Sequence, residues 1–300
     1  MSSNKKLTVF TPTFNRAHTL PRLYESLCRQ TCKDFEWLVI DDGSTDITPD
    51  LLASYKAENK IPVRYIRKEN GGLFTGYNTA YANINSELNV CIDSDDFMPE
   101  DAVEIILKTW EVKGSEKYAG ITGLDFYAGS HTPIGGFFPE NLNEAFLLDL
   151  YLKNIHKGDS KQVMRTDIMK AIPPMQGFPG EKNFNPIYLL LQAADTLPMI
   201  LLNRNLCFVD YQENDSMSKS IWHQYVDSPR SFAKQRVMEM QLKRSNLANN
   251  LRLSVHFVAS SILAKDKEWL KKTPYPALAL LCAIPGFLWY LMILWKNRKN

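Results

Sequence analysis

Residues 93–96 (Asp-Ser-Asp-Asp) place three carboxylates within four positions, directly after the apolar run 88–92. Carboxylates this close repel one another unless a cation or hydrogen-bond donors lie between them. Oxygen ligands on a tight turn suit Mn²⁺ or Mg²⁺, which keep some waters and complete their coordination with substrate phosphates. The same residues also fit an ordinary acidic turn that caps the helix beyond Pro99, so the motif alone leaves both interpretations open.

A second acidic cluster, Asp-Asp-Gly-Ser-Thr-Asp at residues 41–46, follows the apolar run 37–40. A carboxylate at a strand end can accept a hydrogen bond from the imide N–H of a uracil-like base. Residues 11–15 would supply backbone groups and a small pocket around the base and ribose, and the glycine pair at 71–72 lets backbone approach a ligand closely. Turn formation and helix capping are the structural alternative for both motifs.

The segments between these clusters alternate short apolar runs with helical patterns. The continuous apolar runs are typical of parallel strands buried on both faces, so we predict an open parallel sheet with right-handed crossovers. Ligands of such a sheet bind beyond the carboxyl ends of its strands, where all the polar clusters fall. Strands are predicted at 7–11, 37–40, 63–66 and 88–92, with helices around 20–27, 51–55, 75–84 and 102–110.

Composition and charge exclude some classes of protein. The chain has 300 residues, 45% of them hydrophobic and 23% charged, which fits one large α/β domain with an appendage or two modest domains. No nucleic-acid partner is expected, because the net charge is +2 and the basic residues are scattered. The five cysteines lack the second Cys/His pair of a zinc site, so free thiols in a reducing cytoplasm are expected.

Residues 276–295 contain no charged side chain and have basic residues on both sides. A helix of this length reaches about 30 Å, enough to cross the hydrocarbon core of a membrane. Its terminal aromatic residues suit an interfacial anchor as well, and Pro285-Gly286 is expected to kink it. We expect membrane contact through residues 274–296, by spanning or by lying on the surface; a helix packed on the catalytic domain is the alternative.

Four motifs follow one another along the chain: Thr-Pro-Thr-Phe-Asn-Arg at 11–16, Asp-Asp-Gly-Ser-Thr-Asp at 41–46, Asn-Gly-Gly at 70–72 with Tyr-Asn at 77–78, and Asp-Ser-Asp-Asp at 93–96. In this order and spacing, they resemble family 2 glycosyltransferases of the GT-A fold. The resemblance implies a GT-A-like open, mostly parallel sheet flanked by helices, followed by a C-terminal helical extension. It also implies an inverting hexosyltransferase that uses a nucleotide-diphosphate sugar, with a UDP-sugar expected.

The resemblance also implies roles for individual residues. Asp41 or Asp42 would contact the base, while Asp93 and Asp95 would form the Asp-x-Asp element for ribose, phosphate and Mn²⁺ or Mg²⁺. Many relatives carry Arg where this chain has Tyr77, so a basic contact to the donor would come from Arg16, Arg67 or Lys68 instead. The expected donor site comprises Thr11, Pro12, Thr13, Asn15, Arg16, Asp41, Asp42, Asn70, Gly71, Asn78, Asp93 and Ser94.

The catalytic base is expected in the second half of the chain. The segment Gly-Glu-Lys at 180–182 resembles one found in a subset of these enzymes. Glu181 there would take the proton of the acceptor hydroxyl while the metal stabilises the leaving diphosphate; a solvated loop residue paired with Lys182 is the alternative. Asp125, just after a strand predicted at 118–122, is the rival candidate. Asp210 and Glu213 are weaker candidates for the base.

Two further assignments concern the segment after residue 210. His223 would join Asp93 and Asp95 as a third metal ligand, by similarity to some GT-A enzymes, although a lone His is more often structural. Residues 211–218 have the composition of a mobile loop that closes over donor and acceptor.

We therefore expect a GT-A-like domain over residues 1–220, an amphipathic helical extension over 221–272 and an apolar membrane-associating helix over 273–300. Within the first, residues 1–115 would bind the nucleotide-sugar and 116–220 the acceptor. The predicted reaction transfers a sugar to a hydroxyl of a glycan or glycolipid in surface polysaccharide biosynthesis, at the inner face of the plasma membrane. The alternatives are a nucleotidyltransferase, whose Gly-rich basic loop the first motif lacks, and a non-catalytic nucleotide-sugar-binding module at the membrane.

Overall fold

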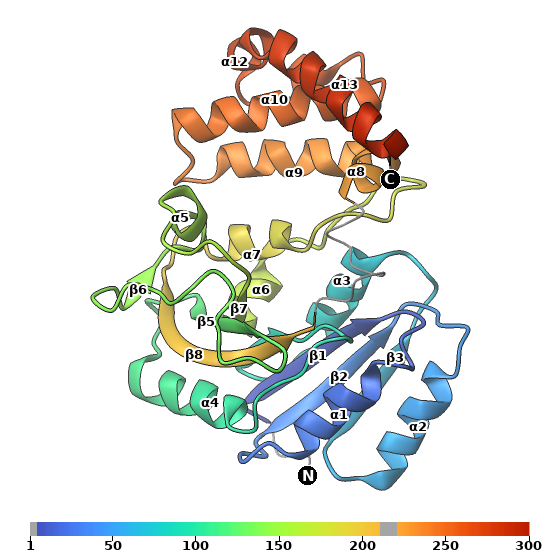
Figure 1. The fold of residues 1–300 in the computed structure, drawn as a ribbon, viewed down its shortest axis with the longest axis vertical. Helices are drawn as coiled ribbons and strands as arrows, with labels where there is room; N and C mark the ends of the chain where they lie inside the picture. Colours follow the sequence, from blue (N-terminus) through green and yellow to red (C-terminus); the bar gives the residue numbers. More distant parts are fainter. Residues whose placement is uncertain (1–4, 211–220, 300) are drawn as a thin grey trace. The chain divides into compact units, whose positions relative to one another are not determined.

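A computed structural model of the protein describes residues 5–210 and 221–299. Within these ranges, eight strands form one sheet in the order β3-β2-β1-β4-β7-β5-β8-β6 (Figure 1). The strands are β1 (Leu7–Thr13), β2 (Phe35–Asp41), β3 (Val63–Arg67), β4 (Leu88–Cys91), β5 (Gly120–Tyr127), β6 (Glu144–Ala145), β7 (Ser160–Arg165) and β8 (Met199–Val209). The helices are α1 (Leu20–Cys28), α2 (Thr48–Glu58), α3 (Leu73–Asn83), α4 (Ala102–Lys113), α5 (Leu147–Leu152), α6 (Thr166–Ala171), α7 (Ile187–Ala193), α8 (Ile221–Asp227), α9 (Pro229–Gln241), α10 (Leu247–Leu263), α11 (Trp269–Lys272), α12 (Pro276–Leu281) and α13 (Ala283–Lys299).

The sheet is mostly parallel. Strand β1 pairs in parallel with β2 and β4, β2 pairs in parallel with β3, and β5 pairs in parallel with β8. Strand β7 runs antiparallel between β4 and β5, and the short β6 runs antiparallel to β8. The expected open, mostly parallel sheet with flanking helices is confirmed, and the carboxyl ends of β1 to β5 and β8 lie at one edge.

Both faces of the sheet are buried, as the continuous apolar strands predict. Side chains alternate along β1, so Leu7 and Val9 enter the core shared with α1, α2 and α4. Phe10 points to the other face, where its ring lies 5.2 Å from that of Tyr77 and 5.5 Å from that of Tyr81 on α3. A strand covered in this way excludes water along its whole length, so its polar groups act only at its carboxyl end.

Two strand boundaries differ from the sequence prediction. Strand β1 continues through Thr13, because it pairs residue by residue with β2 as far as Asp41. Strand β5 extends to Tyr127 through its pairing with β7 and β8, so Asp125 lies within the strand and not after it. Helix α10 begins at Leu247, because the side chain of Asn246 accepts a hydrogen bond from Asn249 N and caps the helix.

Contacts divide the described chain into two compact units. The first contains the sheet and consists of residues 5–71, 75–173 and 193–210. The second contains residues 72–74, 174–192 and 221–299, including α8 to α13. The finer boundaries expected from the sequence, after residues 220 and 272, stay a prediction.

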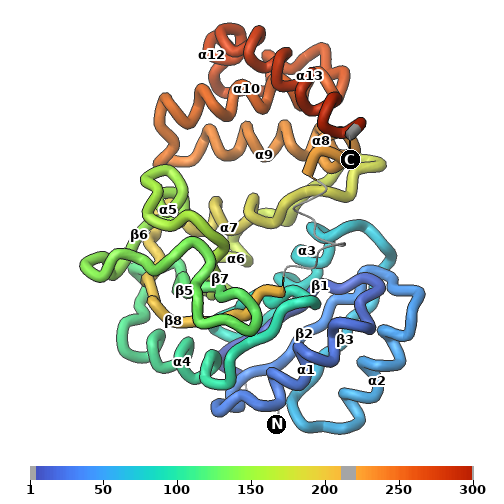
Figure 2. Tube along the Cα trace, in the orientation of Figure 1, coloured from blue at the N-terminus to red at the C-terminus, as the bar shows by residue number. Residues whose placement is uncertain are grey.

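The apolar C-terminal segment forms two helices. Helix α12 ends at Leu281 and α13 begins at Ala283, so the break lies at Cys282 and not at the Pro285-Gly286 pair (Figure 2). Pro285 falls in the first turn of α13, where its missing N–H has no helical partner to lose. Within residues 5–210 and 221–299, no helix combines the length and apolar character needed to cross a lipid bilayer.

Helix α13 packs closely on α10, with α9 on the other side of α10 (Figure 1). Gly286 makes this approach possible, because a Cβ atom at this position would lie 2.5 Å from Cβ and Cγ1 of Val258. Ile293, two turns after Gly286 on the same side of α13, is fully buried, and Trp289 packs at the same interface. The glycine that suggested a kink in the sequence is therefore a packing residue.

Substitution Gly286→Val should force α13 away from α10 and lower the free energy of unfolding of this unit by about 1–3 kcal/mol. Urea unfolding followed by tryptophan fluorescence measures the loss. Leu288→Ala on the exposed side of the same helix is the control and should change stability by less than about 0.5 kcal/mol. Equal midpoints for Gly286→Val and the wild type would show that the two helices do not need this close contact.

Candidate functional site

The polar clusters predicted from the sequence lie at the carboxyl edge of the first unit. Strand β2 ends at Asp41, β4 ends just before residues 93–96, and β1 lies between these two strands. Strands two positions apart in a sheet are separated by about 10 Å. The two acidic clusters therefore lie along one edge, at a separation that an extended nucleoside diphosphate can bridge.

Asp41 is fully buried and its carboxylate has protein partners. Its Oδ1 accepts a hydrogen bond from Ser44 N at 2.8 Å, and its Oδ2 accepts one from the hydroxyl of Tyr65 at 2.7 Å. The guanidinium Nε of Arg67 lies 3.8 Å from the same Oδ2. Asp41 thus holds the loop after β2 to the end of β3.

Asp42 organises the third motif. Its carboxylate pairs with Lys68 Nζ and accepts hydrogen bonds from Gly71 N at 3.0 Å and from Asn70 Nδ2 at 3.2 Å. Asn70 also donates to the backbone carbonyl of Asp42 at 2.9 Å. The side chain of Asp42 is 9% exposed, whereas that of Asp41 is fully buried. Asp42 is therefore the more accessible of the two candidates for contact with the nucleotide base.

The first motif divides between the core and the edge. The hydroxyl of Thr11 accepts a hydrogen bond from Trp37 Nε1 at 3.0 Å inside the core, and Pro12 packs against Gly76. Thr13 closes the strand, and its carbonyl accepts a hydrogen bond from Asp42 N at 2.8 Å. The buried Oγ1 of Thr13 has no hydrogen-bond partner among the described residues. Of the two threonines in this motif, Thr13 is therefore the one whose hydroxyl could hydrogen-bond a ligand.

Asn15 joins the loops after β1 and β2. Its backbone is left-handed, with φ of 54°, and its N–H donates to Ser44 Oγ at 2.9 Å. Its side-chain Oδ1 accepts hydrogen bonds from the backbone N–H groups of Thr45 at 2.8 Å and Asp46 at 3.3 Å. Two motifs 30 residues apart thereby form one rigid part of the edge.

The departure from the family pattern at Tyr77 has a visible cause in packing. The Tyr77 ring is buried against Phe10, a position that a charged Arg side chain would fill poorly. Lys68 and Arg67 both contact the second motif, and Asn78 follows half-buried on α3. Cationic side chains are thus present beside the second motif, although the Arg of many relatives is missing.

The acidic loop is anchored on its far side. Asp93 is exposed and Ser94 buried, and Asp96 N donates to the carbonyl of Asp93 at 3.1 Å. Phe97 exchanges two backbone hydrogen bonds with Phe208 on β8, and the two rings stack at 5.1 Å. The loop is held at both ends, which fixes where its carboxylates lie.

Burial and mutual repulsion disfavour the charged forms of these carboxylates. Burial, and then the neighbouring Asp93, raise the pKa of Asp95, whereas Arg16 and Arg22 lower it. Burial, together with Asp93 and Asp95, raises the pKa of Asp96 to about 8 despite the nearby Lys161. The protein alone therefore does not fully compensate the negative charge of the loop.

Lys161 on β7 links the acidic loop to Asp125 on β5. Its Nζ lies 3.9 Å from Asp96 Oδ2 and 3.7 Å from Asp125 Oδ2. Burial alone lowers the pKa of Lys161, but Asp125 and Asp96 raise it above the ordinary value, so the ammonium stays charged. Burial raises the pKa of Asp125 to about 6, and its Oδ1 has no hydrogen-bond partner in the described chain.

Arg22 on α1 is a second cation that the sequence analysis missed. It donates to the backbone carbonyl of Asp95, forms an ion pair with Asp210 at 2.5 Å, and lies over the Phe97 ring at 4.8 Å. The available signals were weak: for Arg22, one basic residue beside the apolar face of an amphipathic helix, and for Lys161, one basic residue within a short strand. Asp210, a minor candidate base, is thereby tied to the acidic loop.

Glu181, the other candidate base, belongs to the second unit and caps α9. Its Oε1 accepts hydrogen bonds from Arg230 N at 3.1 Å and Arg230 Nε at 2.9 Å. Its Oε2 accepts from Ser231 N at 2.8 Å and Ser231 Oγ at 2.7 Å. Four donors bind the carboxylate of Glu181, whose side chain is only 4% exposed, so Glu181 has a structural role that the sequence pattern did not show.

The predicted metal ligands come from both units. Asp93 and Asp95 lie on the same loop, whereas His223 is exposed on α8 in the other unit, so its role as a third ligand stays a prediction. Across the described ranges, no three His, Cys, Asp or Glu side chains converge as a metal-binding group. Incompletely compensated carboxylates nevertheless fit a cation that takes its other ligands from phosphate and water. Glu213 and the expected closing loop at 211–218 lie outside the described residues.

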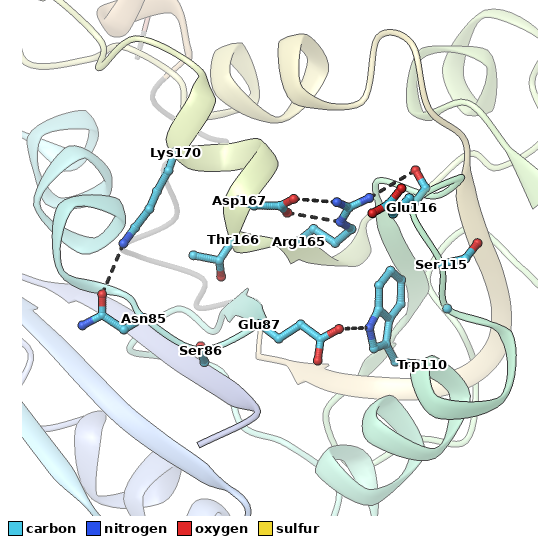
Figure 3. A pocket seen from close by; sticks show the side chains of 11 residues that line it. Asn85, Ser86, Glu87, Trp110, Ser115, Glu116, Arg165, Thr166, Asp167 and Lys170 are labelled. Carbon is cyan, nitrogen blue, oxygen red and sulfur yellow. Dashed lines mark hydrogen bonds and ion pairs between the residues drawn. The ribbon is translucent and has the colours of Figure 1, made fainter. Parts of the chain in front are cut away.

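A separate cavity of about 540 Å³ lies at the opposite, amino edge of β4 (Figure 3). Its polar groups already pair with one another: Trp110 Nε1 donates to Glu87 Oε1 at 2.6 Å, and Arg165 binds Asp167 through two nitrogens. Ligands of parallel sheets bind at the carboxyl edge, so we assign this cavity no part in the chemistry.

An open, mostly parallel α/β sheet with two acidic clusters at its carboxyl edge is the architecture expected of a GT-A-type transferase. The sequence profile of glycosyl transferase family 2 matches residues 8–169, more than half of the chain. The chain belongs to this family and is a glycosyltransferase. The non-catalytic alternative has no support from this assignment.

Named relatives agree with the family. Glycosyltransferase GlyA of Streptococcus pneumoniae serotype 4 is 30% identical over 151 residues, which are 50% of this chain but only 21% of GlyA. The poly(ribitol-phosphate) beta-N-acetylglucosaminyltransferase TarP of Staphylococcus aureus is 26% identical over 285 residues, which cover 89% of this chain and 86% of TarP. The match to TarP thus extends well beyond the donor half.

Two solved structures have the same fold. Staphylococcus aureus TarS 1–349 in complex with UDP-GlcNAc is 17% identical, with a TM-score of 0.65 over 98% of this chain and 92% of that one. Mannosyltransferase PcManGT from Pyrobaculum calidifontis, in complex with GDP-Man and Mn²⁺, is 14% identical, with a TM-score of 0.54 over 95% and 88%. At these identities the likeness establishes the GT-A-like architecture.

Substitution Lys161→Met should destabilise the protein by about 3–5 kcal/mol at pH 8, because it leaves Asp96 and Asp125 buried without their cation. Both pKa values would then rise further above those of the unfolded chain. The folded state would bind more protons between about pH 4 and 8, so its stability would fall as pH rises. Urea unfolding at pH 5 and pH 8 should therefore show the smaller loss at pH 5.

The control for this substitution is Lys108→Met, which removes an exposed ion pair with Glu104 and should cost less than about 1 kcal/mol at either pH. A Lys161→Met loss that does not depend on pH would show that Lys161 acts by packing and not by compensating these carboxylates.

Proposed function

We propose that the protein is an inverting glycosyltransferase that moves a sugar from a UDP-sugar to a hydroxyl of a glycan or lipid-linked acceptor. The observation that carries this proposal is the common edge shared by Asp42 at the end of β2 and the acidic loop after β4. One end of that edge suits a nucleotide base and the other a diphosphate. The TarS structures, solved with UDP-GlcNAc and with UDP, support a uridine donor.

The donor is proposed to lie along this edge. Asp42, or the more deeply buried Asp41, would accept the imide N–H of the base, with Thr13 and the backbone of Asn15 beside the ribose. The backbone of Gly71 and the side chains of Asn70 and Asn78 would border the other side, with Thr11 and Pro12 shaping the strand beneath. Arg16 and Ser94 would face the ribose and phosphates, and Lys68 would supply the basic contact that the family places on Arg.

Asp93 and Asp95 would hold Mn²⁺ or Mg²⁺, with His223 as a proposed third ligand. When bound, such an ion stabilises the negative charge that develops on the leaving diphosphate. The raised pKa of Asp95 supports this assignment, because a carboxylate that burial and repulsion disfavour gains most from a nearby cation. The Mn²⁺ named with PcManGT is a further support.

The reaction would be a single displacement. The acceptor oxygen forms a bond to the anomeric carbon as the bond from that carbon to the diphosphate oxygen breaks, and the nucleoside diphosphate leaves with the electron pair. We propose Asp125 as the base that receives the hydroxyl proton, because it shares the first unit with the acidic loop and its Oδ1 is unpaired. Glu181 is the second candidate, although its oxygens already accept four hydrogen bonds.

The acceptor is proposed to be a surface polymer or its lipid-linked precursor. TarP, which matches 89% of this chain, is named for transfer of N-acetylglucosamine to poly(ribitol phosphate), so a teichoic-acid-like polymer is the first acceptor to test. The location at the inner face of the plasma membrane stays a prediction from the sequence.

Substitution Asp95→Asn should lower transfer from UDP-sugars by at least about a hundredfold, since charge stabilisation at the leaving group supplies several kcal/mol. In the wild type, UDP with Mn²⁺ at a hundred times its dissociation constant should stabilise the fold by about 2.7 kcal/mol, and EDTA should remove most of this gain. Melting curves and a UDP-release assay measure both effects.

The Asp101→Asn variant, which changes a half-exposed side chain and breaks its ion pair with Arg204, serves as the matched control and should keep full activity. Full transfer by Asp95→Asn, or no response to UDP and Mn²⁺ in the wild type, would refute the proposed donor site.

Substitution Asp125→Asn should lower kcat by about a hundredfold or more while UDP binding persists. A base works in its ionised form, so wild-type kcat should rise with pH through about 6, the raised pKa of Asp125, and then level off. Activity of the variant should not show this rise. Glu181→Gln should lower thermal stability through the weakened α9 cap but keep most of the activity; the opposite pattern would make Glu181 the base.

A further inference from the structure

Helix α13 has apolar side chains on two opposite faces. One face packs in the second unit, through Gly286 against Val258 and through the buried Ile293. The other face carries Ile284, Phe287, Leu288, Leu291 and Trp295, whose exposures range from 44% at Leu291 to 75% at Ile284. A helix needs one apolar face to pack on its neighbour, so the second face requires another explanation.

The exposed residues form a continuous stripe. The spacing from Ile284 by three, four, seven and eleven positions returns to the same side of an α-helix at each step. Helix α12 adds Leu280 and Leu281, exposed by 56% and 76%, at the end that adjoins α13. Helices α12 and α13 both lie beside α10 (Figure 1). The stripe runs along the helices, as in an element that lies flat on a surface.

Basic residues gather around this stripe. Between Lys265 and Lys299 the sequence has seven basic and two acidic residues, although the whole chain carries a net charge of only +2. Lys271 and Lys272 are exposed before the stripe. At its other end Arg298 is exposed, and Lys296 lies over the ring of Trp295 at 5.2 Å. The remainder of the chain has a net negative charge, so this part alone attracts an anionic surface.

The charge pattern decides which partner fits. Both ends of the stripe are basic, so a second copy of the chain pairing through the same face would bring like charges together in either orientation. Anionic phospholipid instead presents apolar acyl chains beside negative headgroups, and each matches one part of this surface. A terminal Trp with flanking Lys and Arg is also the composition that settles at the headgroup level.

We propose that the exposed stripe of α12 and α13 docks flat on an anionic lipid bilayer, with Ile284, Phe287, Leu288, Leu291 and Trp295 entering the headgroup–acyl boundary. The two helices attach the enzyme to one leaflet without crossing it. This inference concerns the second unit alone and holds whatever sugar the enzyme transfers.

Vesicle co-sedimentation of the full chain, without nucleotide or metal, tests this proposal. The wild type should bind vesicles of phosphatidylcholine with 30% phosphatidylglycerol and bind pure phosphatidylcholine at least tenfold more weakly. Raising NaCl from 0.1 to 0.5 M should weaken anionic binding, because the charge contribution is screened. The Ile284→Gln, Leu288→Gln double variant should lose at least tenfold in partition coefficient.

Matched controls separate the stripe from general exposure and from catalysis. The double variant Ile47→Gln, Val112→Gln removes equally exposed apolar residues from the first unit and should bind as the wild type. Asp95→Asn should also bind fully, so a failure of the proposed transfer chemistry would not affect this result. Lys296→Gln with Arg298→Gln should bind less tightly and with a smaller salt dependence.

Three results would overturn the proposal: no binding of the wild type to anionic vesicles, unchanged binding of the correctly folded Ile284→Gln, Leu288→Gln variant, or an oligomer that this variant disperses and that does not bind lipid. The last result, from analytical ultracentrifugation, would assign the stripe to an interface between copies of the chain.

Discussion

Repulsion among carboxylates is the constraint on which this site depends. The carboxyl edge of the sheet carries Asp41 and Asp42 after β2 and residues 93–96 after β4, and Asp125 lies on β5 near them. In a site shielded from water such groups lose hydration and repel one another, so each loop needs positive charge or N–H donors to hold one conformation. The arrangement of those partners determines what each part of the edge can bind.

The two acidic clusters are compensated differently. Around Asp41 and Asp42 the protein supplies the partners itself: backbone N–H groups, a Tyr hydroxyl, Arg67 and Lys68. The loop at 93–96 receives less, because Lys161 is shared with Asp125 and Arg22 binds a backbone carbonyl. Carboxylates whose charge the protein already compensates suit recognition of a neutral base. Carboxylates with incomplete compensation suit a cation that brings phosphates as further ligands.

The sequence predicted the sheet and the family well because both depend on local patterns. Strands buried on two faces must be apolar throughout, and the four motifs occupy turns whose residue types are constrained. It missed partners supplied from a distance: Arg22 from α1, Lys161 from an antiparallel strand inserted between β4 and β5, and Ser231, 50 residues beyond Glu181. No local pattern marks such pairs, since each becomes evident only once the chain has folded.

The hydrogen bond between Gly71 N and Asp42 has a consequence for how the enzyme responds to its donor. Gly71 is the last residue of one compact unit before the chain enters the other at Gly72. A uracil ring that used Asp42 would share this carboxylate with the peptide at the junction. Linkage is reciprocal, so a conformation of the turn at residues 70–71 that favours the nucleotide is favoured by it in return. Donor binding and the order of this turn would thereby be coupled through one carboxylate.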